Sequence, residues 1–158
     1  PVFGIDKDLG TKKCIGKYVS PVTEGTFAME DTPNIGESMV ENPGVYCKSA
    51  NVSVLAVNGK TPLITLNQFG AGKAMYLSSF RVSKESTRFL MRALLTLLGK
   101  EDKVRDYICD NLYTECAYYE EIDKLVVINN SGDTQKTVIK TAKGDVTVEL
   151  APFATKVL

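Results

Sequence analysis

The clearest pattern of apolar and polar positions lies between Ser83 and Gly99. Apolar residues repeat there in two rows at helical spacing, Leu90–Leu94–Leu97 and Met91–Leu95–Leu98. The intervening polar residues Lys84, Arg88, Arg92 and Thr96 form one stripe at i, i+4 spacing. We predict a helix with Ser83 as N-cap and Gly99 as its stop. It should be buried over most of its circumference, with the polar stripe as its exposed edge.

Three apolar runs precede this helix and have the composition of strands, at 52–58, 62–69 and 73–79. Asn58-Gly59 predicts a turn between the first two runs, and Gly70-Ala71-Gly72 predicts a three-residue hairpin loop between the next two. The expected order is therefore strand–strand–strand–helix, with the helix packed on the sheet. Its apolar surface exceeds what three strands can cover, so we also expect an exposed apolar face.

The first 51 residues are rich in glycine and proline and predict mainly loops, with short strands near Cys14–Val19 and Gly44–Cys47. After Gly99 an acidic, tyrosine-rich stretch leads into period-two patterns at 125–129, 135–141 and 145–150, and 152–157 could add an edge strand. Residues 104–158 thus predict a small antiparallel β sandwich or half-barrel.

Charge divides the chain at the same place. Residues 1–99 carry 11 basic and 8 acidic residues, and residues 100–158 carry 8 and 11. This shift supports two domains, 1–99 and 104–158, in a chain of 158 residues. The patterns thus predict a sheet-and-helix region followed by a mainly β region.

The composition excludes several kinds of site. The chain has no histidine, so a Ser-His-Asp triad, a Cys-His dyad and a histidine-ligated metal are ruled out. Its net charge of zero argues against a general nucleic-acid binder. No apolar run is long enough for a membrane helix, and no signal peptide is visible, so we expect a cytoplasmic location.

The four cysteines are spaced unlike zinc ligands, and we expect them to be reduced and structural. They are Cys14, Cys47, Cys109 and Cys116. Asn51-Val52-Ser53 and Asn129-Asn130-Ser131 match the glycosylation sequon, which we interpret as chance.

Three groups of residues could carry chemistry, and each has a simpler interpretation. Gly70-Ala71-Gly72-Lys73 is like part of a phosphate-binding loop, but the glycines join two strands, which favours a hairpin. The carboxylates Glu115, Glu120, Glu121 and Asp123 could act as paired acids on a glycoside, but charge runs are usually solvated. The tyrosines Tyr113, Tyr118 and Tyr119 could form a sugar platform, although a β-domain core is favoured.

A nucleophilic serine has no support in the sequence. Ser78, Ser79 and Ser83 lack a histidine base, and no pattern indicates a pair between a serine and Lys84. We therefore assign no catalytic, substrate-binding or metal-binding residue to this chain.

Several segments together resemble one family of enzymes. They are PVFGIDKDLG (1–10), LITLNQFGAGKAMYLSSF (63–80), STRFLMRALLTLL (86–98) and KLVVINNSGD (124–133). In this order they are similar to the C-terminal portion of the β-galactoside phosphorylases, which include the 1,3-β-galactosyl-N-acetylhexosamine (lacto-N-biose) phosphorylases and their galactosyl-rhamnose relatives. The resemblance implies a parent enzyme with an N-terminal TIM-type barrel, a central amidotransferase-like α/β domain and a C-terminal β domain.

The resemblance further implies that the parent cleaves β-galactosides with inorganic phosphate, inverting the anomer to give α-galactose 1-phosphate, without a cofactor. The family's catalytic acid lies in the barrel, so no position here inherits that role. Residues 1–99 would be the end of the amidotransferase-like domain, and residues 104–158 the β domain, so the implied fold class is α/β plus all-β. A chain starting at Pro1 is expected to be cut from a longer protein. Its expected partners are the rest of the enzyme or another copy, as a homodimer.

Two alternatives remain open at this stage. The chain could be an independent carbohydrate-binding or oligomerisation module of a β-galactosidase-like enzyme, with the three tyrosines as its binding face. It could also be a self-contained hydrolase that uses the Glu120 region.

Overall fold

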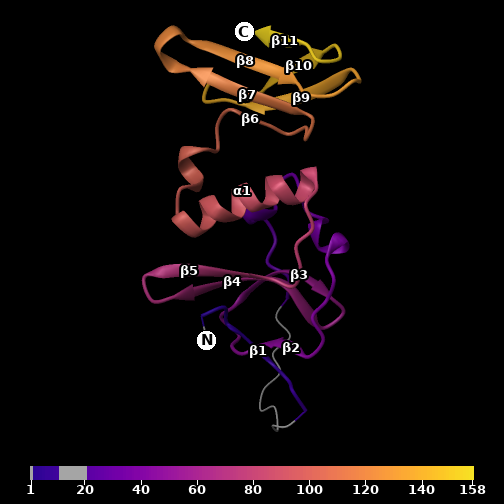
Figure 1. Ribbon diagram of the computed structural model, residues 1–158. Helices are drawn as coiled ribbons and strands as arrows, with labels where there is room; N and C mark the ends of the chain where they lie inside the picture. Colours follow the sequence, from indigo (N-terminus) through magenta and orange to yellow (C-terminus); the bar gives the residue numbers. More distant parts are fainter. Residues whose placement is uncertain (1, 11–20) are drawn as a thin grey trace. The chain divides into compact units, whose positions relative to one another are not determined.

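The computed structural model describes residues 2–10 and 21–158 and divides the chain into two compact units. Unit 1 is Pro1–Gly99 and unit 2 is Lys100–Leu158. The strand predicted near Cys14–Val19 lies outside the described residues. Unit 1 contains these elements: β1 (Ile5–Lys7), η1 (Phe27–Met29), η2 (Ile35–Ser38), β2 (Val45–Cys47), β3 (Ser53–Asn58), β4 (Thr61–Phe69), β5 (Gly72–Leu77) and α1 (Lys84–Leu98) (Figure 1).

The main sheet of unit 1 is antiparallel with the order β3-β4-β5, as predicted. Asn58 pairs with Thr61, so the turn beginning at Asn58-Gly59 is confirmed, and Gly59 adopts a left-handed φ of 56°. Phe69 pairs with Gly72, which makes the second hairpin loop two residues long. The prediction of a three-residue loop was wrong because Gly72 already belongs to β5.

A small sheet of β1 and β2 packs near β4 and anchors the N-terminal segment. The β2 strand confirms the prediction at Gly44–Cys47. The Asn67 side chain donates a hydrogen bond of 2.8 Å to the Val2 carbonyl, and the Thr65 hydroxyl donates one of 3.2 Å to the Phe3 carbonyl. These two bonds tie the start of the described chain to β4.

Helix α1 has the predicted ends. The Ser83 hydroxyl accepts the Ser86 amide at 3.1 Å, and the Ser86 hydroxyl accepts the Ser83 amide in return, which completes a capping box. Gly99 ends the helix in a left-handed conformation with φ of 61°. Both ends were predictable because each cap bonds backbone groups of residues nearby in the sequence.

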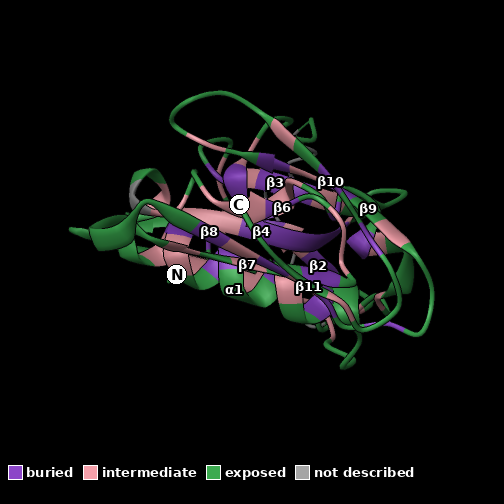
Figure 2. Cartoon of the chain, turned by 90° about the horizontal axis from the view of Figure 1, so that it is seen from above, coloured by how far each residue is buried: buried purple, intermediate pink, exposed green. Residues whose placement is uncertain are grey.

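The orientation of α1 differs from the prediction. Arg92 and Thr96 of the predicted exposed edge are buried, at 3% and 5% exposure. The apolar residues Leu94 and Leu98 are instead exposed, at 52% and 65%. Figure 2 shows α1 with both buried and exposed stretches. The expected exposed apolar face is therefore confirmed, whereas the expected polar edge is wrong at its two C-terminal positions.

The physical reason is a charged cluster between α1 and η1. The Arg92 guanidinium contacts the carboxylates of Glu30 and Asp31 and lies 4.6 Å from the centre of the Phe27 ring. Arg88 adds a second bond of 3.2 Å to Asp31. A buried guanidinium requires such partners, and they turn this side of the helix toward its own unit.

The hydrophobic core of unit 1 lies between α1 and the main sheet. Phe89 and Ala93 of α1 pack in one cluster with Leu55, Leu63 and Ile64 of β3 and β4. Met75 and Leu77 of β5 pack against this cluster. The helix thus covers the sheet with residues spaced four apart, which is the geometry of one helical face.

Unit 2 consists of two three-stranded antiparallel sheets that share one core, with the orders β10-β9-β6 and β11-β8-β7. Its elements are η3 (Glu101–Lys103), β6 (Ile108–Cys109), β7 (Thr114–Tyr119), η4 (Glu120–Ile122), β8 (Lys124–Asn129), β9 (Gln135–Lys140), β10 (Val146–Leu150) and β11 (Thr155–Val157). Strands β8 to β11 were predicted, including β11 at a sheet edge. Strands β6 and β7 were not predicted.

In the part of the chain that the structure describes, no helix combines the length and apolar character required to cross a bilayer.

The charged cluster should carry much of the stability of unit 1. We expect Arg92→Met to lower the free energy of unfolding by about 2 kcal/mol, because it leaves the Asp31 carboxylate without its buried partner. Urea unfolding followed by the helical circular dichroism signal would measure the loss. Arg105→Met is the matched control, since Arg105 is 61% exposed and lies 4.0 Å from Asp102. It should change stability by less than about 0.5 kcal/mol, and equal losses in the two variants would contradict the assignment.

Candidate functional site

The carboxylates considered for catalysis lie at the surface, and Glu115 is separate from the other three. Glu115 lies on β7, four residues before Tyr119, so a strand rise of about 3.3 Å per residue places it roughly 13 Å from the end of that strand. Glu120 and Glu121 are exposed in η4, which follows that end. The interpretation of these charges as a solvated surface is therefore confirmed.

Asp123 belongs to a small polar cluster at the surface. It accepts a hydrogen bond of 2.7 Å from the Tyr118 hydroxyl and two of 3.0 Å from the Lys143 ammonium. The Tyr118 bond, followed by Lys143, lowers the pKa of the Asp123 carboxyl. The same bond raises the pKa of the Tyr118 hydroxyl, because only the protonated phenol can donate it to the carboxylate. This cluster fastens the β7–β8 turn to the loop that contains Lys143.

The three tyrosines do not form one platform. Tyr113 and Tyr119 are 42% and 55% exposed, whereas Tyr118 packs against the core of unit 2. Tyr118 stacks on Tyr107 with ring centres 4.0 Å apart. Because successive residues of a strand point to opposite faces, Tyr118 and Tyr119 cannot share a face. The core interpretation is thus confirmed for Tyr118 and wrong for the other two.

Asn129, the first residue of one sequon, is a buried structural residue. Its amide nitrogen donates to the carbonyls of Asp133 at 2.7 Å and Ala151 at 2.9 Å, while its amide oxygen accepts the Ser131 amide and hydroxyl at 2.9 Å. The side chain joins β8 to the turn after it and to the end of β10. A glycan could not be attached there without breaking this network, so interpreting the sequon as chance agrees with the structure.

The glycine-rich segment and the serines also have structural roles. Gly70-Ala71 forms the β4–β5 hairpin, as expected, and the Lys73 ammonium donates to the Thr96 carbonyl at 3.2 Å. Ser83 caps α1, and the Ser79 hydroxyl accepts the Val40 amide at 2.7 Å.

The three described cysteines carry free thiols, as predicted, and Cys14 lies outside the described residues. Burial raises the pKa of the Cys47 thiol, and the half-buried Cys116 thiol donates to the Tyr107 carbonyl at 3.0 Å. Within residues 2–10 and 21–158, no group of three or more acidic, cysteine or histidine side chains is placed to hold a metal ion.

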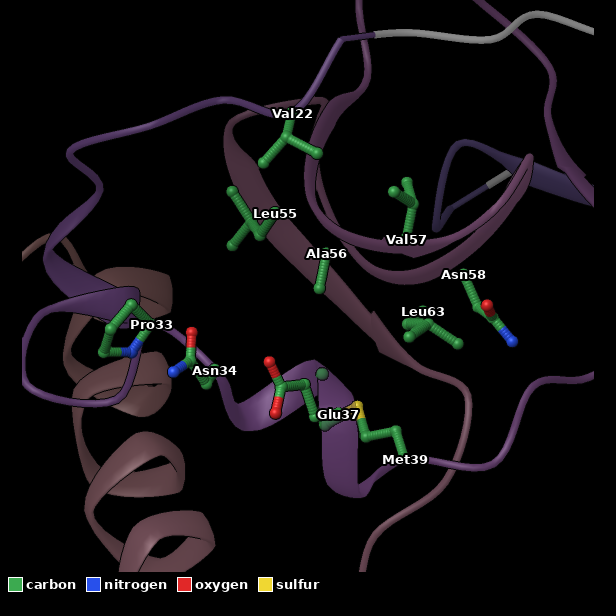
Figure 3. A pocket seen from close by; sticks show the side chains of 11 residues that line it. Val22, Pro33, Asn34, Glu37, Met39, Leu55, Ala56, Val57, Asn58 and Leu63 are labelled. Carbon is green, nitrogen blue, oxygen red and sulfur yellow. The ribbon is translucent and has the colours of Figure 1, made fainter.

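A cavity of about 520 Å³ lies between η2 and β3 and was not predicted (Figure 3). Leu55, Ala56 and Leu63 supply apolar surface, while Glu37 and Asn58 supply polar groups. The η2 helix lies close to the strand because position 36 is glycine, where a Cβ would come within 2.9 Å of the Ala56 Cβ. The described lining offers a carboxylate and amides but no cationic side chain, so it gives a phosphate no charge-assisted partner.

Comparison with known proteins identifies the family. The sequence model of the lacto-N-biose phosphorylase central domain matches residues 1–102, and that of the C-terminal domain matches residues 107–158. The chain belongs to the lacto-N-biose phosphorylase family. The resemblance drawn from the four sequence segments is thereby confirmed.

Curated relatives within this family are phosphorylases of β-galactosides. The chain is 33% identical over 160 residues to D-galactosyl-β-1→4-L-rhamnose phosphorylase of Lachnoclostridium phytofermentans, covering 99% of this chain and 21% of that protein. It is 29% identical over 141 residues to a 1,3-β-galactosyl-N-acetylhexosamine phosphorylase of the same organism, covering 87% and 19%. The enzyme of that name from Bifidobacterium longum is 25% identical over 173 residues, covering 90% and 23%. The chain thus spans about a fifth of the length of these relatives.

The Tyr118–Asp123 bond should be visible in a pH titration. Because the folded-state pKa of Asp123 is lowered, its stabilising effect is complete above the ordinary value of 3.8 and is lost as the pH falls through the lowered value. We expect Tyr118→Phe to raise the Asp123 pKa, measured by NMR at the carboxyl carbon. Glu115→Gln is the control and should leave that pKa unchanged. An identical Asp123 titration in Tyr118→Phe and the parent chain would contradict the bond.

The Asn129 network should stabilise unit 2. Asn129→Ala leaves several buried backbone groups without partners and should cost about 2–3 kcal/mol of unfolding free energy. NMR signals of β8 and β9 amides during urea unfolding follow this unit separately from unit 1. Asn130, the exposed residue next to Asn129, provides the control. Asn130→Ala should lower the free energy of unfolding by less than about 0.5 kcal/mol. A small loss in Asn129→Ala would show that the network is dispensable.

Proposed function

We propose that this chain is a non-catalytic region of a galactoside phosphorylase, made of the end of its central domain and its C-terminal domain. The observation that carries the proposal is the order of the two family matches, residues 1–102 and 107–158, in a chain one fifth as long as its relatives. The whole enzyme would convert a β-galactoside and inorganic phosphate to α-galactose 1-phosphate, with inversion and without another cofactor.

The surroundings of the acidic groups support a non-catalytic role. Inverting glycoside hydrolases place two carboxyl groups about 6.5–9.5 Å apart on either side of the sugar, whereas phosphorolysis needs one general acid because phosphate is the nucleophile. Here Glu115, Glu120 and Glu121 lie exposed at the surface, and Asp123 is occupied by Tyr118 and Lys143. The acid of the reaction would therefore come from another part of the enzyme, which we take to be a TIM-type barrel.

The finer assignment of unit 1 is also part of the proposal. Its three strands and one covering helix suit the end of an amidotransferase-like α/β domain, in which helices cover a larger sheet. The exposed apolar residues of α1 support a partner, which would be the remainder of the enzyme or a second copy in a homodimer. The proposed location is the cytoplasm.

One observation favours a second candidate, a carbohydrate-binding role for unit 2. Tyr113 and Tyr119 expose about half of their surface, and exposed aromatic rings can stack on sugars. The strand between them separates the two rings by roughly 20 Å, which is more than one sugar ring spans. Binding would therefore involve an oligosaccharide or only one tyrosine.

Two measurements test the main proposal. The chain alone should release no galactose 1-phosphate from galactosyl-rhamnose or galactosyl-N-acetylhexosamine with phosphate, and calorimetry with these sugars should give no heat. Grafted in place of the matching C-terminal fifth of D-galactosyl-β-1→4-L-rhamnose phosphorylase, it should restore activity that the truncated relative lacks. Turnover by the chain alone would contradict the non-catalytic role. Binding heat that Tyr119→Ala abolishes and Tyr118→Phe retains would favour the second candidate.

A further inference from the structure

The outer edge of β5 is an unpaired strand edge within the described residues. β5 pairs with β4 along its whole length and ends the sheet order β3-β4-β5. The Ser78 amide donates to the Leu63 carbonyl at 2.8 Å, so every second residue before it, Tyr76 and Ala74, directs its backbone groups to β4. In an antiparallel pair, alternate residues direct their backbone groups away from the partner strand. Met75 and Leu77 therefore present their N–H and C=O groups at the outer edge.

The opposite edge of the sheet is partly occupied. Val22 forms a parallel bridge with Val54 of β3, and the Thr23 amide donates to the Val54 carbonyl at 2.7 Å. Further along β3, η2 packs against Ala56, where Gly36 permits the close approach. A new strand would have to displace these contacts at β3, whereas β5 accepts one without rearrangement.

Helix α1 presents apolar side chains on the β5 side of the unit. The helix packs on β5 and η1, while η1 and η2 lie toward β3. Arg92 points to η1. At 3.6 residues per turn, Leu90 and Leu94 lie about 160° around the helix from Arg92. They therefore point away from η1, over the open edge of β5, with exposures of 37% and 52%.

We propose that the β5 edge and the Leu90–Leu94 flank of α1 form one docking surface for a strand-and-helix segment from another part of the same phosphorylase polypeptide. The strand would extend the sheet beside β5 through Met75 and Leu77. An apolar helix would cover the two leucines. This inference rests on the proposed function, because it places the segment in the part of the enzyme outside this chain.

The size of the surface favours a tethered segment over a second copy. Leu90, Met91, Leu94 and Leu98 are about half exposed and present at most roughly 400 Å² of apolar surface. A stable interface between separate proteins buries about 800 Å² on each partner, roughly 450–520 Å² of it apolar, so these side chains fall short of what a separate partner needs. A segment of the same polypeptide needs less area, because the tether gives it a millimolar effective concentration. The relatives are about five times as long as this chain and contain enough polypeptide to supply it.

Hydrogen–deuterium exchange resolved by residue tests the proposal in the isolated chain and in the graft described above. In the isolated chain, which should be monomeric by light scattering, the Met75 and Leu77 amides should exchange at least tenfold faster than those of Ala74 and Tyr76, which bond to β4. In the graft they should slow by at least tenfold. Fast exchange at both positions in an active graft would overturn the proposal while leaving the proposed function intact.

Protection of these two amides in the isolated chain would also overturn the proposal, since the edge would then be covered by this chain or by a second copy. Light scattering would identify a second copy. An inactive graft with protected β5 amides would instead count against the proposed function and leave the docking surface supported.

A pair of substitutions separates the backbone donor from the side chain. Met75→Pro removes the outward N–H without breaking the β4 ladder, and Met75→Ala shortens the side chain but keeps that N–H. In the graft, the Met75→Pro variant should have at least tenfold lower activity or soluble yield than the Met75→Ala variant. In the isolated chain, the same two variants should unfold at similar urea concentrations. Equal behaviour of the two grafts would show that no strand bonds to β5.

Discussion

The ion pairs of Arg92 with Glu30 and Asp31 determine how unit 1 presents its surfaces. A guanidinium is expensive to bury, and it is retained here because two carboxylates and the face of Phe27 surround it. Since the helix is rigid, fixing Arg92 toward η1 fixes every other side chain of α1. Phe89 and Ala93 then meet the sheet, and Leu90, Leu94 and Leu98 face outward. The exposed apolar surface is thus a consequence of a buried charge.

The two units differ in how far their sheets are covered. In unit 2, two sheets cover one another, and Val127, Ile139 and Val148 form a core that needs no other segment. In unit 1, the outer edge of β5 is unpaired among the described residues. Helix α1 exposes the apolar side chains of Leu90 and Leu94 beside that edge. An open edge beside an apolar patch is typical of a surface that pairs with another segment. The closed unit and the open unit therefore suit different positions in a larger enzyme.

Local signals explain what could be predicted from the sequence. Ser83 and Gly99 bound α1 through contacts within a few residues, and the β8 to β10 patterns alternate at period two with turns between them. The burial of Arg92 could not be predicted in this way, because its partners lie about 60 residues away and polar residues in a stripe are ordinarily exposed. Strand β6 has only two residues and gives no periodic signal. The separation of Tyr118 from Tyr119, in contrast, follows from the alternation of side chains once β7 is recognised as a strand. The cavity between η2 and β3 depends on Gly36 meeting Ala56, a long-range contact without a local pattern.

The length of one connection explains why the open edge and the apolar flank coincide. Residues 78–83 join β5 to α1, so the helix must begin close to the strand that it follows. Two tight hairpins place β5 at the end of the sheet, and the short connection then holds α1 above that end. With the helix fixed there, only its rotation remains to be set, and Arg92 sets it. Lengthening the connection would free the helix to move toward β4, and its leucines would no longer overhang the edge. The two hairpins and the short connection, which are local, and the ion pairs, which are long-range, thus together place the open edge of β5 and the exposed leucines of α1 on the same side of unit 1.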